Sequence, residues 1–386
     1  MTTRADNHSK GGTSVNDVNG PAAAHDDRDG RVFELDATSV VRVPLHNGPI
    51  SDIDISPDGR RLVVTNYARD LVSVIDANTC RVSSTVTGLA EPFAVTMSSA
   101  DANYAYVSTA TAGYDAIEVI DVVTNWRIAT HQLANSVSDL TVSPDGKYLY
   151  ASRNAVRGAD VTVLDTTTGE LEVIELAAAT GTTTECLRIS PDGRRLYVGM
   201  NAPTGGSLAV IETRTRSDNR RVGGRSRIVG VIDLGLPVRD VALSDDGGTA
   251  YVASCDPVAG VVLDVVDTRD NKIVGTHKIP EITGPLTRMT LSRDGARAYL
   301  VSDDRITVLS THTQDVVGEV MMAKHPSCVV ESPDGTHLYI ADYSGVVTAA
   351  RIASTERSQT HIGVTDRDLS VAGWLPELPE WEPVLA

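Results

Sequence analysis

Charged side chains recur at one place in the sequence pattern, within short apolar stretches that precede a repeated turn. Three are aspartates and two are arginines: Asp52, Asp139, Arg188, Asp240 and Arg288. If these stretches gather around one axis, the carboxylates and guanidinium groups would face a common space. Such a set can bind a polar ligand or a peptide that carries both charges. The alternative is that the five side chains pair with one another and with channel water.

Further candidate binding residues stand in segments that are predicted to form loops at one face of the fold. They are histidines that precede the first and last repeats, and tyrosines and arginines that follow a second strand. Together with the five charged residues they form a predicted surface for a ligand or partner: His46, Asp52, Tyr67, Asp139, Arg153, Arg188, Asp240, Arg288, Arg305, His325 and Tyr343.

Metal and catalytic motifs give little support for chemistry at this surface. His46 and His325 would be neighbours in a closed ring, where Asp52 could complete a metal site. None of the nine histidines, however, has the HxH, HxxxH or HExxH spacing of metal ligands. The chain also contains no GxSxG elbow, no phosphate-binding loop and no GxGxxG after a strand. The sequence therefore predicts no metal and no cofactor, and it favours a protein without catalytic activity.

One segment concentrates basic charge in a chain whose net charge is −17. Residues 213–227 contain six arginines: Arg214, Arg216, Arg220, Arg221, Arg225 and Arg227. This hairpin could bind nucleic acid, an acidic membrane surface or an acidic partner. It lacks the interleaved aromatic residues that stack on single strands, and the acidic balance of the chain disfavours nucleic acid. A solvated, mobile hairpin is the alternative.

The elements that would position these residues follow from a tetrapeptide of the type Ser-Pro-Asp-Gly. It recurs at intervals of 40 to 54 residues, with copies that begin at Ser56, Ser99, Ser143, Ser190, Ser244, Ser292 and Ser332. Proline presets φ, aspartate bonds to its own backbone, and glycine adopts a positive φ, so each copy predicts a tight turn.

The flanks of the turn repeat as well. An apolar stretch precedes each copy, and a stretch rich in Tyr or Val, such as RLYVGM, follows it. Third and fourth stretches, such as VTVLD and KIVGTHKI, follow in most repeats. An acidic residue that ends the third stretch is expected to cap the next turn: Asp76, Asp121, Asp165, Glu212 and Asp267. This period is typical of a propeller blade, so the sequence predicts an all-β, seven-bladed β-propeller with four antiparallel strands per blade.

These motifs resemble the YVTN-repeat family of bacterial β-propellers, which are similar to WD40-like repeats, over residues 38 to 353. The resemblance implies the fold but no single function, since such propellers serve as surface-layer modules, binding platforms and enzymes. Some seven-bladed propellers are lactonases, and no catalytic residue of theirs can be transferred to a position of this chain.

The two ends of the repeat array complement each other. The last turn is followed by only two strands, whereas Thr38–Leu45 is a strand without a blade. We therefore expect the N-terminal strand to close the last blade, which leaves no open seam. The predicted domains are a disordered polar segment (1–37), the propeller (38–353) and a C-terminal tail packed on or near it (354–386).

The sequence also gives expectations for the location and the oligomeric state of the protein. The N-terminus has no apolar signal region, and no apolar run is long enough to span a bilayer. A cytoplasmic location is therefore expected, with leaderless export as the alternative. A closed ring with short edges predicts a monomer. The expected function is a non-enzymatic binding or scaffold propeller for a protein or peptide. The alternatives are a lactonase-type hydrolase acting in the central channel and nucleic-acid binding through residues 213–227.

Overall fold

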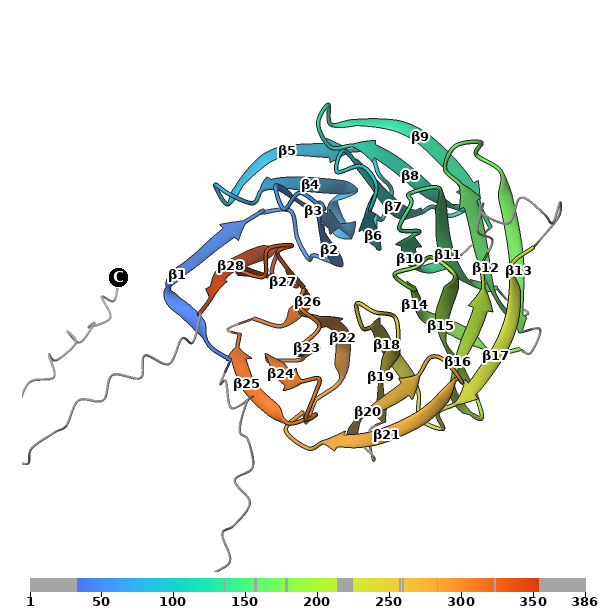
Figure 1. Ribbon diagram of the computed structural model, residues 1–386. Helices are drawn as coiled ribbons and strands as arrows, with labels where there is room; N and C mark the ends of the chain where they lie inside the picture. Colours follow the sequence, from blue (N-terminus) through green and yellow to red (C-terminus); the bar gives the residue numbers. More distant parts are fainter. Residues whose placement is uncertain are drawn as a thin grey trace, which may run out of the picture. The chain divides into compact units, whose positions relative to one another are not determined.

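Seven four-stranded antiparallel sheets are arranged around one axis in the computed structural model of the chain (Figure 1). The structure describes residues 33–134, 136–155, 158–177, 180–213, 225–256, 258, 260–282, 284–322 and 324–353. The predicted seven-bladed propeller is confirmed.

Blades 1 to 4 follow the order of the chain from the inside outward. Blade 1 consists of β2 (Asp52–Ile55), β3 (Arg61–Asn66), β4 (Leu71–Asp76) and β5 (Arg81–Thr87), with a 3-10 turn, η1 (Tyr67–Arg69), after β3. Blade 2 consists of β6 (Val95–Met97), β7 (Tyr104–Ala110), β8 (Asp115–Asp121) and β9 (Trp126–Leu133). Blade 3 consists of β10 (Val137–Val142), β11 (Tyr148–Ala155), β12 (Gly158–Asp165) and β13 (Leu171–Ala177). Blade 4 consists of β14 (Thr183–Ile189), β15 (Arg195–Ala202), β16 (Gly205–Glu212) and β17 (Arg227–Asp233).

Blades 5 and 6 repeat this order, and blade 7 departs from it. Blade 5 consists of β18 (Val238–Leu243), β19 (Thr249–Asp256), β20 (Gly260–Asp267) and β21 (Lys272–Ile279). Blade 6 consists of β22 (Leu286–Leu291), β23 (Arg297–Ser302), β24 (Arg305–Ser310) and β25 (Val316–Met321). Blade 7 combines β26 (Pro326–Glu331), β27 (His337–Asp342) and β28 (Val346–Ile352) with β1 (Leu35–Pro44).

The N-terminal strand closes the ring as the sequence predicted. Strand β1 pairs antiparallel with β28, with Val43 opposite Val347. It begins at Leu35, three residues before the predicted start. Phe33, just ahead of it, is buried and lies edge-on to Tyr299 of blade 6, with ring centroids 5.7 Å apart. The N-terminal segment therefore joins blade 7 to blade 6 as well as completing blade 7.

The repeated tetrapeptide forms the expected turn between the first and second strands. In blade 3, Ser143 Oγ donates to Asp145 Oδ1 at 2.7 Å, and the same carboxylate oxygen accepts the backbone N–H of Lys147 at 3.1 Å. Gly146 has a φ of 70°, which a side chain would oppose. Each turn is thus held by its own side chains and fixes the register of two strands.

Most of the acidic residues that end third strands have the predicted capping role. The Asp121 carboxylate accepts the backbone N–H groups of Val123 and Thr124 at 2.8 and 3.0 Å. Asp76, Asp165 and Asp267 accept backbone N–H groups in the same way.

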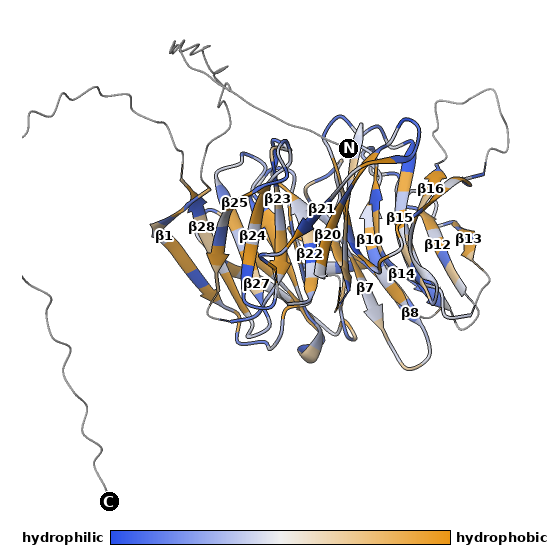
Figure 2. Cartoon of the chain, turned by 90° about the horizontal axis from the view of Figure 1, so that it is seen from below, coloured by the Kyte–Doolittle hydropathy of each residue, from blue (hydrophilic) through white to orange (hydrophobic). Residues whose placement is uncertain are grey.

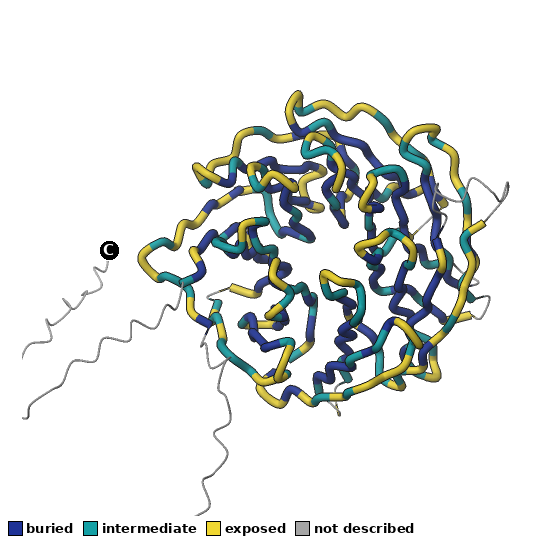
Figure 3. Tube along the Cα trace, in the orientation of Figure 1, coloured by how far each residue is buried: buried dark blue, intermediate teal, exposed yellow. Residues whose placement is uncertain are grey.

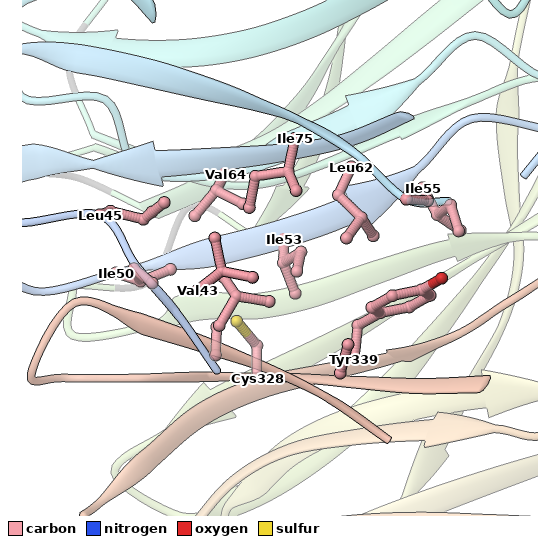
Figure 4. Packing of buried hydrophobic residues seen from close by; sticks show 14 residues of the cluster. Val43, Leu45, Ile50, Ile53, Ile55, Leu62, Val64, Ile75, Cys328 and Tyr339 are labelled. Atoms are coloured by element: carbon pink, nitrogen blue, oxygen red, sulfur yellow. The ribbon is translucent and has the colours of Figure 1, made fainter. Parts of the chain in front are cut away.

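The core lies between blades and not within any single one. One buried cluster joins Ile53, Leu62 and Val64 of blade 1 to Cys328 and Tyr339 of blade 7 (Figure 4). Burial is concentrated in the inner and middle strands, whereas the outer strands are largely exposed (Figure 3). In the side view, hydrophobic residues follow the strands and hydrophilic residues the loops at the two faces (Figure 2). Each blade is therefore stabilised mainly by burial against its neighbours.

All four cysteines are free, with Cys186 and Cys328 buried. Within the described part of the chain, no helix is long and apolar enough to cross a membrane. Residues 1–32, most of the arginine-rich hairpin and the tail 354–386 lie outside the described residues, and the predictions for them stay predictions.

Candidate functional site

The predicted aspartates of the inner strands join neighbouring blades. Asp52, Asp139 and Asp240 occupy the same position in the first strands of blades 1, 3 and 5, four residues before the Ser of the turn. Each carboxylate accepts a backbone N–H from the first strand of the next blade. The distances are 3.0 Å from Val95 to Asp52, 3.1 Å from Leu187 to Asp139 and 2.9 Å from Met289 to Asp240. These three contacts are called the blade clamps below.

The two predicted arginines connect the clamps. Arg188 donates to Asp139 at 2.7 Å and to Asp240 at 2.8 Å. Arg288 forms longer ion pairs, with Asp52 at 3.3 Å and Asp139 at 3.6 Å. Arg188 lies two residues further along its strand than the other four residues do along theirs, and its long side chain spans the offset. The structure thus brings all five residues into one network that runs through blades 1, 3, 4, 5 and 6.

The network governs the ionisation of its acids. Burial alone would raise the pKa of Asp139, but the charges of Arg188 and Arg288 and hydrogen bonds hold that pKa below its usual value. Burial raises the pKa of Asp52, and the charge of Arg288 offsets this only in part. The surrounding carboxylates keep the pKa of both guanidinium groups above the usual value. The five side chains are therefore paired with one another, and contact of theirs with a ligand stays a prediction.

Asp54 is a further inner-strand carboxyl that the sequence reasoning did not select. It lies two residues after Asp52, keeps part of its surface accessible, and accepts the backbone N–H groups of Met97 and Ile55, each at 2.7 Å. None of the described arginines forms an ion pair with it. Burial therefore raises the pKa of Asp54 to about 7. The alternation of Asp52 and Asp54 along one strand was a usable signal for it.

Two predicted arginines of the loops have partners of their own. Arg153 Nε and Nη2 donate to the Asp160 carboxylate at 2.8 and 2.9 Å across the β11–β12 hairpin. Arg305 donates to Asp304 at 2.9 Å and to Glu319 at 3.2 Å. The Arg153 side chain is also mostly buried. Its bidentate pair holds the hairpin together and leaves little of the guanidinium for a ligand.

The two predicted histidines lie on the loops but assemble no metal site. The Nδ1 atom of His325 lies 2.6 Å from the Asp303 backbone oxygen, a contact between blades 7 and 6. His46 is exposed, with a φ of 58°. Across the described residues, no group of three His, Cys, Asp or Glu side chains is placed to hold a metal ion.

The two predicted tyrosines occupy equivalent positions in neighbouring blades. Tyr67 follows β3 of blade 1 and Tyr343 follows β27 of blade 7. Their loops adjoin: Gly48 lies against Ala68 on one side and Gly345 on the other. Two more exposed aromatic residues, which sequence reasoning missed, lie on the loops of blade 2. The four residues, here called the aromatic arc, are Tyr343 (45% exposed), Tyr67 (39%), Phe93 (49%) and Tyr114 (39%).

Hydrogen bonds fix the backbone of the arc. The Tyr343 N–H donates to the His325 oxygen at 3.0 Å, and Thr65 Oγ1 donates to the Phe93 oxygen at 2.8 Å. The Phe93 N–H in turn donates to the Ser108 oxygen at 2.9 Å. The blades therefore hold the backbone in place at two of the four rings, Tyr343 and Phe93.

The arginine-rich hairpin is described only at its end. Arg225 is exposed, and Arg227 pairs with Glu212 at 2.7 Å where β17 begins. Glu212 is thus an ion-pair partner; the turn that it was predicted to cap lies outside the described residues, so that prediction stays a prediction. The other four arginines, Arg214, Arg216, Arg220 and Arg221, lie outside the described residues.

Comparison with known proteins gives three results. The sequence model of the family described as "Lactonase, 7-bladed beta-propeller" matches residues 97–202. The chain is 53% identical over 391 aligned residues to the seven-bladed beta-propeller protein Rv1057 of Mycobacterium tuberculosis, covering 96% of this chain and 99% of that protein. A chain of Kuenenia stuttgartiensis hydrazine synthase superposes with a TM-score of 0.67 at 22% identity, covering 79% of this chain and 96% of that one. At that identity the last result shows likeness of fold alone.

Proposed function

We propose that this chain, which belongs to the family of seven-bladed β-propeller proteins that includes Rv1057 of Mycobacterium tuberculosis, works as a binding platform and not as an enzyme. The platform is the face that carries the loops between second and third strands and between blades. Its partner is a protein or peptide that contacts the aromatic arc.

The observation that carries this proposal is the exposure of the arc. Phe93 is half exposed although the chain has only two phenylalanines, and the other one, Phe33, is buried. Large, exposed aromatic side chains on a firm backbone are typical of the residues that dominate binding energy at protein interfaces. Four of them stand on the loops of three consecutive blades.

The charged residues of the inner strands support a structural role beside this surface. Their hydrogen bonds at 2.7 to 3.1 Å join neighbouring blades. Each of the three aspartates has an arginine within 3.3 Å and also accepts a backbone N–H, and Arg188 contacts two aspartates. A partner therefore binds to loops of a propeller whose inner strands are already joined by these contacts.

The second candidate is a lactonase-type hydrolase. The family match at residues 97–202 favours it, and so does Asp54, a carboxyl whose pKa near 7 suits a general base. No group of side chains that could hold a metal ion occurs among the described residues to accompany that carboxyl. The binding platform is therefore preferred, with lactone hydrolysis as the activity to test against it.

The same proposal places the protein in the cytoplasm as a monomer. Four free cysteines and no disulfide fit a reducing compartment. A ring closed by its own N-terminal strand needs no second copy to protect an open seam.

Site-specific photo-crosslinking in a lysate of the source organism tests the platform. A benzophenone side chain replaces Tyr67 in one bait and Trp126 in the control bait. Trp126 is an equally aromatic residue that is 71% exposed on the outer strand β9. A protein captured at position 67, and lost when Tyr343→Ala is added, supports the proposal.

Capture of the same proteins at both positions, or of none at position 67, contradicts the platform. The hydrolase is tested in parallel with a panel of sugar lactones. Hydrolysis by the intact chain that Asp54→Asn reduces at least tenfold would replace the platform with the enzyme.

A further inference from the structure

We propose that the aromatic arc recognises a cation, and that its partner therefore presents a lysine or arginine side chain to it. The inference rests on the proposed function and adds the chemistry of the ligand. Aromatic rings beside carboxylates are the arrangement that binds ammonium and guanidinium groups, because the ring face carries negative electrostatic potential.

Acidic side chains lie beside Tyr343 at one end of the arc and in the loops of Tyr67 and Phe93. Asp303 is well exposed, and its charge acts on Tyr343. Asp70 follows Tyr67 in the same turn, and its Oδ1 atom accepts the backbone N–H of Glu91 at 3.0 Å. Glu91 is exposed in the loop that also carries Phe93. Exposed carboxylates therefore share the loops of Tyr67 and Phe93 or act on Tyr343.

The inner strands below the loops add to the negative potential. Four carboxyl groups, Asp52, Asp54, Asp139 and Asp240, share the axis with two guanidinium groups, those of Arg188 and Arg288. Carboxylates outnumber guanidinium groups by three to two even when Asp54 is protonated. The whole chain, at −17, has the same sign. An approaching cation is attracted from a distance and held at the rings.

Two basic side chains on the same loops limit the breadth of the site. Arg69 is exposed in η1 and Lys324 is exposed in the loop that leads into blade 7. They stand beside the arc and would repel a long run of basic residues. The arrangement therefore fits one or two separated cationic side chains in a peptide and not a polycation.

Fluorescence anisotropy with short labelled peptides tests this. The probe is (Lys-Gly-Ser)3, and its matched control carries acetyl-lysine, which keeps the side-chain length and removes the charge. The full chain is compared with Tyr67→Leu/Tyr343→Leu, with Tyr67→Phe/Tyr343→Phe, and with Trp126→Leu as the control for an exposed ring elsewhere.

The lysine peptide should bind the intact chain at least fivefold more tightly than the acetylated peptide. The leucine pair should weaken binding about 4- to 25-fold, about 2- to 5-fold for each ring, whereas the phenylalanine pair and Trp126→Leu should bind as the intact chain does. Glu91→Gln/Asp303→Asn should weaken binding more than Glu170→Gln/Asp270→Asn, a pair of exposed acids in turns between third and fourth strands.

Equal binding of the charged and acetylated peptides overturns the inference, as does equal weakening by the control variants. The platform itself is judged separately by crosslinking at position 67. If a partner is captured there while the lysine peptide shows no preference, the platform stands and cation recognition falls. If neither is seen, both fall.

Discussion

Replacing Asp139 by asparagine removes the charge on which the inner network converges. Asp139 is buried and accepts from the Leu187 backbone, from its own neighbour Leu140 and from Arg188, and it also pairs with Arg288. Asparagine keeps the shape and one acceptor oxygen, but its amide group must face a guanidinium or a backbone N–H. Both arginines are only partly exposed, and each loses one of two carboxylates.

The loss of unfolding free energy depends on which ion pairs the two arginines keep. Breaking a buried ion pair by removing one partner costs about 3 to 5 kcal/mol. Arg188 keeps Asp240 and Arg288 keeps Asp52, so we expect the lower end, about 3 kcal/mol. Urea unfolding at pH 7 measures this loss directly. In a propeller of this size the melting temperature should fall by about 4 to 5 °C.

The pH dependence gives a second check on the same variant. Because the folded-state pKa of Asp139 is lowered, its ionised form stabilises the fold above the pKa of the unfolded chain, and this contribution is lost as the pH falls through the folded-state value. The deficit of the variant should therefore shrink below about pH 4. The control is Asp270→Asn, whose carboxylate pairs with Lys272 at 3.3 Å on the surface and whose loss should cost under about 1 kcal/mol. A deficit for Asp139→Asn no larger than that of the control would refute the reasoning.

Three further predictions concern other parts of the ring. Because the pKa of Asp54 is raised to about 7, the protonated carboxyl favours the folded state; this contribution to stability is present below about pH 4 and is lost as the pH rises to 7. In Asp54→Asn this ionisation is absent. In urea titrations, the variant should therefore lose less stability than the intact chain between about pH 5 and pH 8. Gly206→Ala should destabilise the fold by more than about 2 kcal/mol, since the added Cβ would lie 2.1 Å from the Leu236 backbone oxygen, whereas Gly113→Ala meets no atom within 4 Å and should change the melting temperature little. Removing residues 1–45 should abolish cooperative thermal unfolding, and removing only 1–32 should preserve it; preservation by both would show that β1 does not close the ring.

Sequence periodicity predicted the fold because each turn carries its own signature. The Ser-Pro-Asp-Gly copies hold their turns by local hydrogen bonds, which leave a short pattern in sequence. The degenerate copy in blade 2 shows the limit of that signal. Ser98, one residue before the predicted start, bonds to the Tyr104 backbone as Ser56 does to Arg61, so that turn is one residue longer. No local pattern distinguishes the two serines.

The candidate site was harder to predict, because it depends on which side chains pair across blades. The inner-strand aspartates were selected from their spacing, but their spacing could not show that each one bonds to the next blade. Arg153 looked available in sequence, yet Asp160 of the facing strand occupies its guanidinium. Phe93 and Tyr114 were not predicted as site residues, because their exposure depends on how the blades assemble and cannot be read from the sequence.

Because blade 7 combines strands from opposite ends of the chain, it can be completed only after nearly the whole propeller has been translated. Strand β1 starts at Leu35 and its partner β28 ends at Ile352, so about 310 residues separate the ends of this pairing. At a ribosomal rate of roughly 5–20 residues per second, the first strand waits about 15 to 60 seconds for its partner to emerge. Val40 and Val41 remain exposed even in the finished strand. Throughout that interval the segment of β1 has no strand to pair with. Its apolar residues are therefore more open to a chaperone in the ribosome-bound chain than in the finished ring.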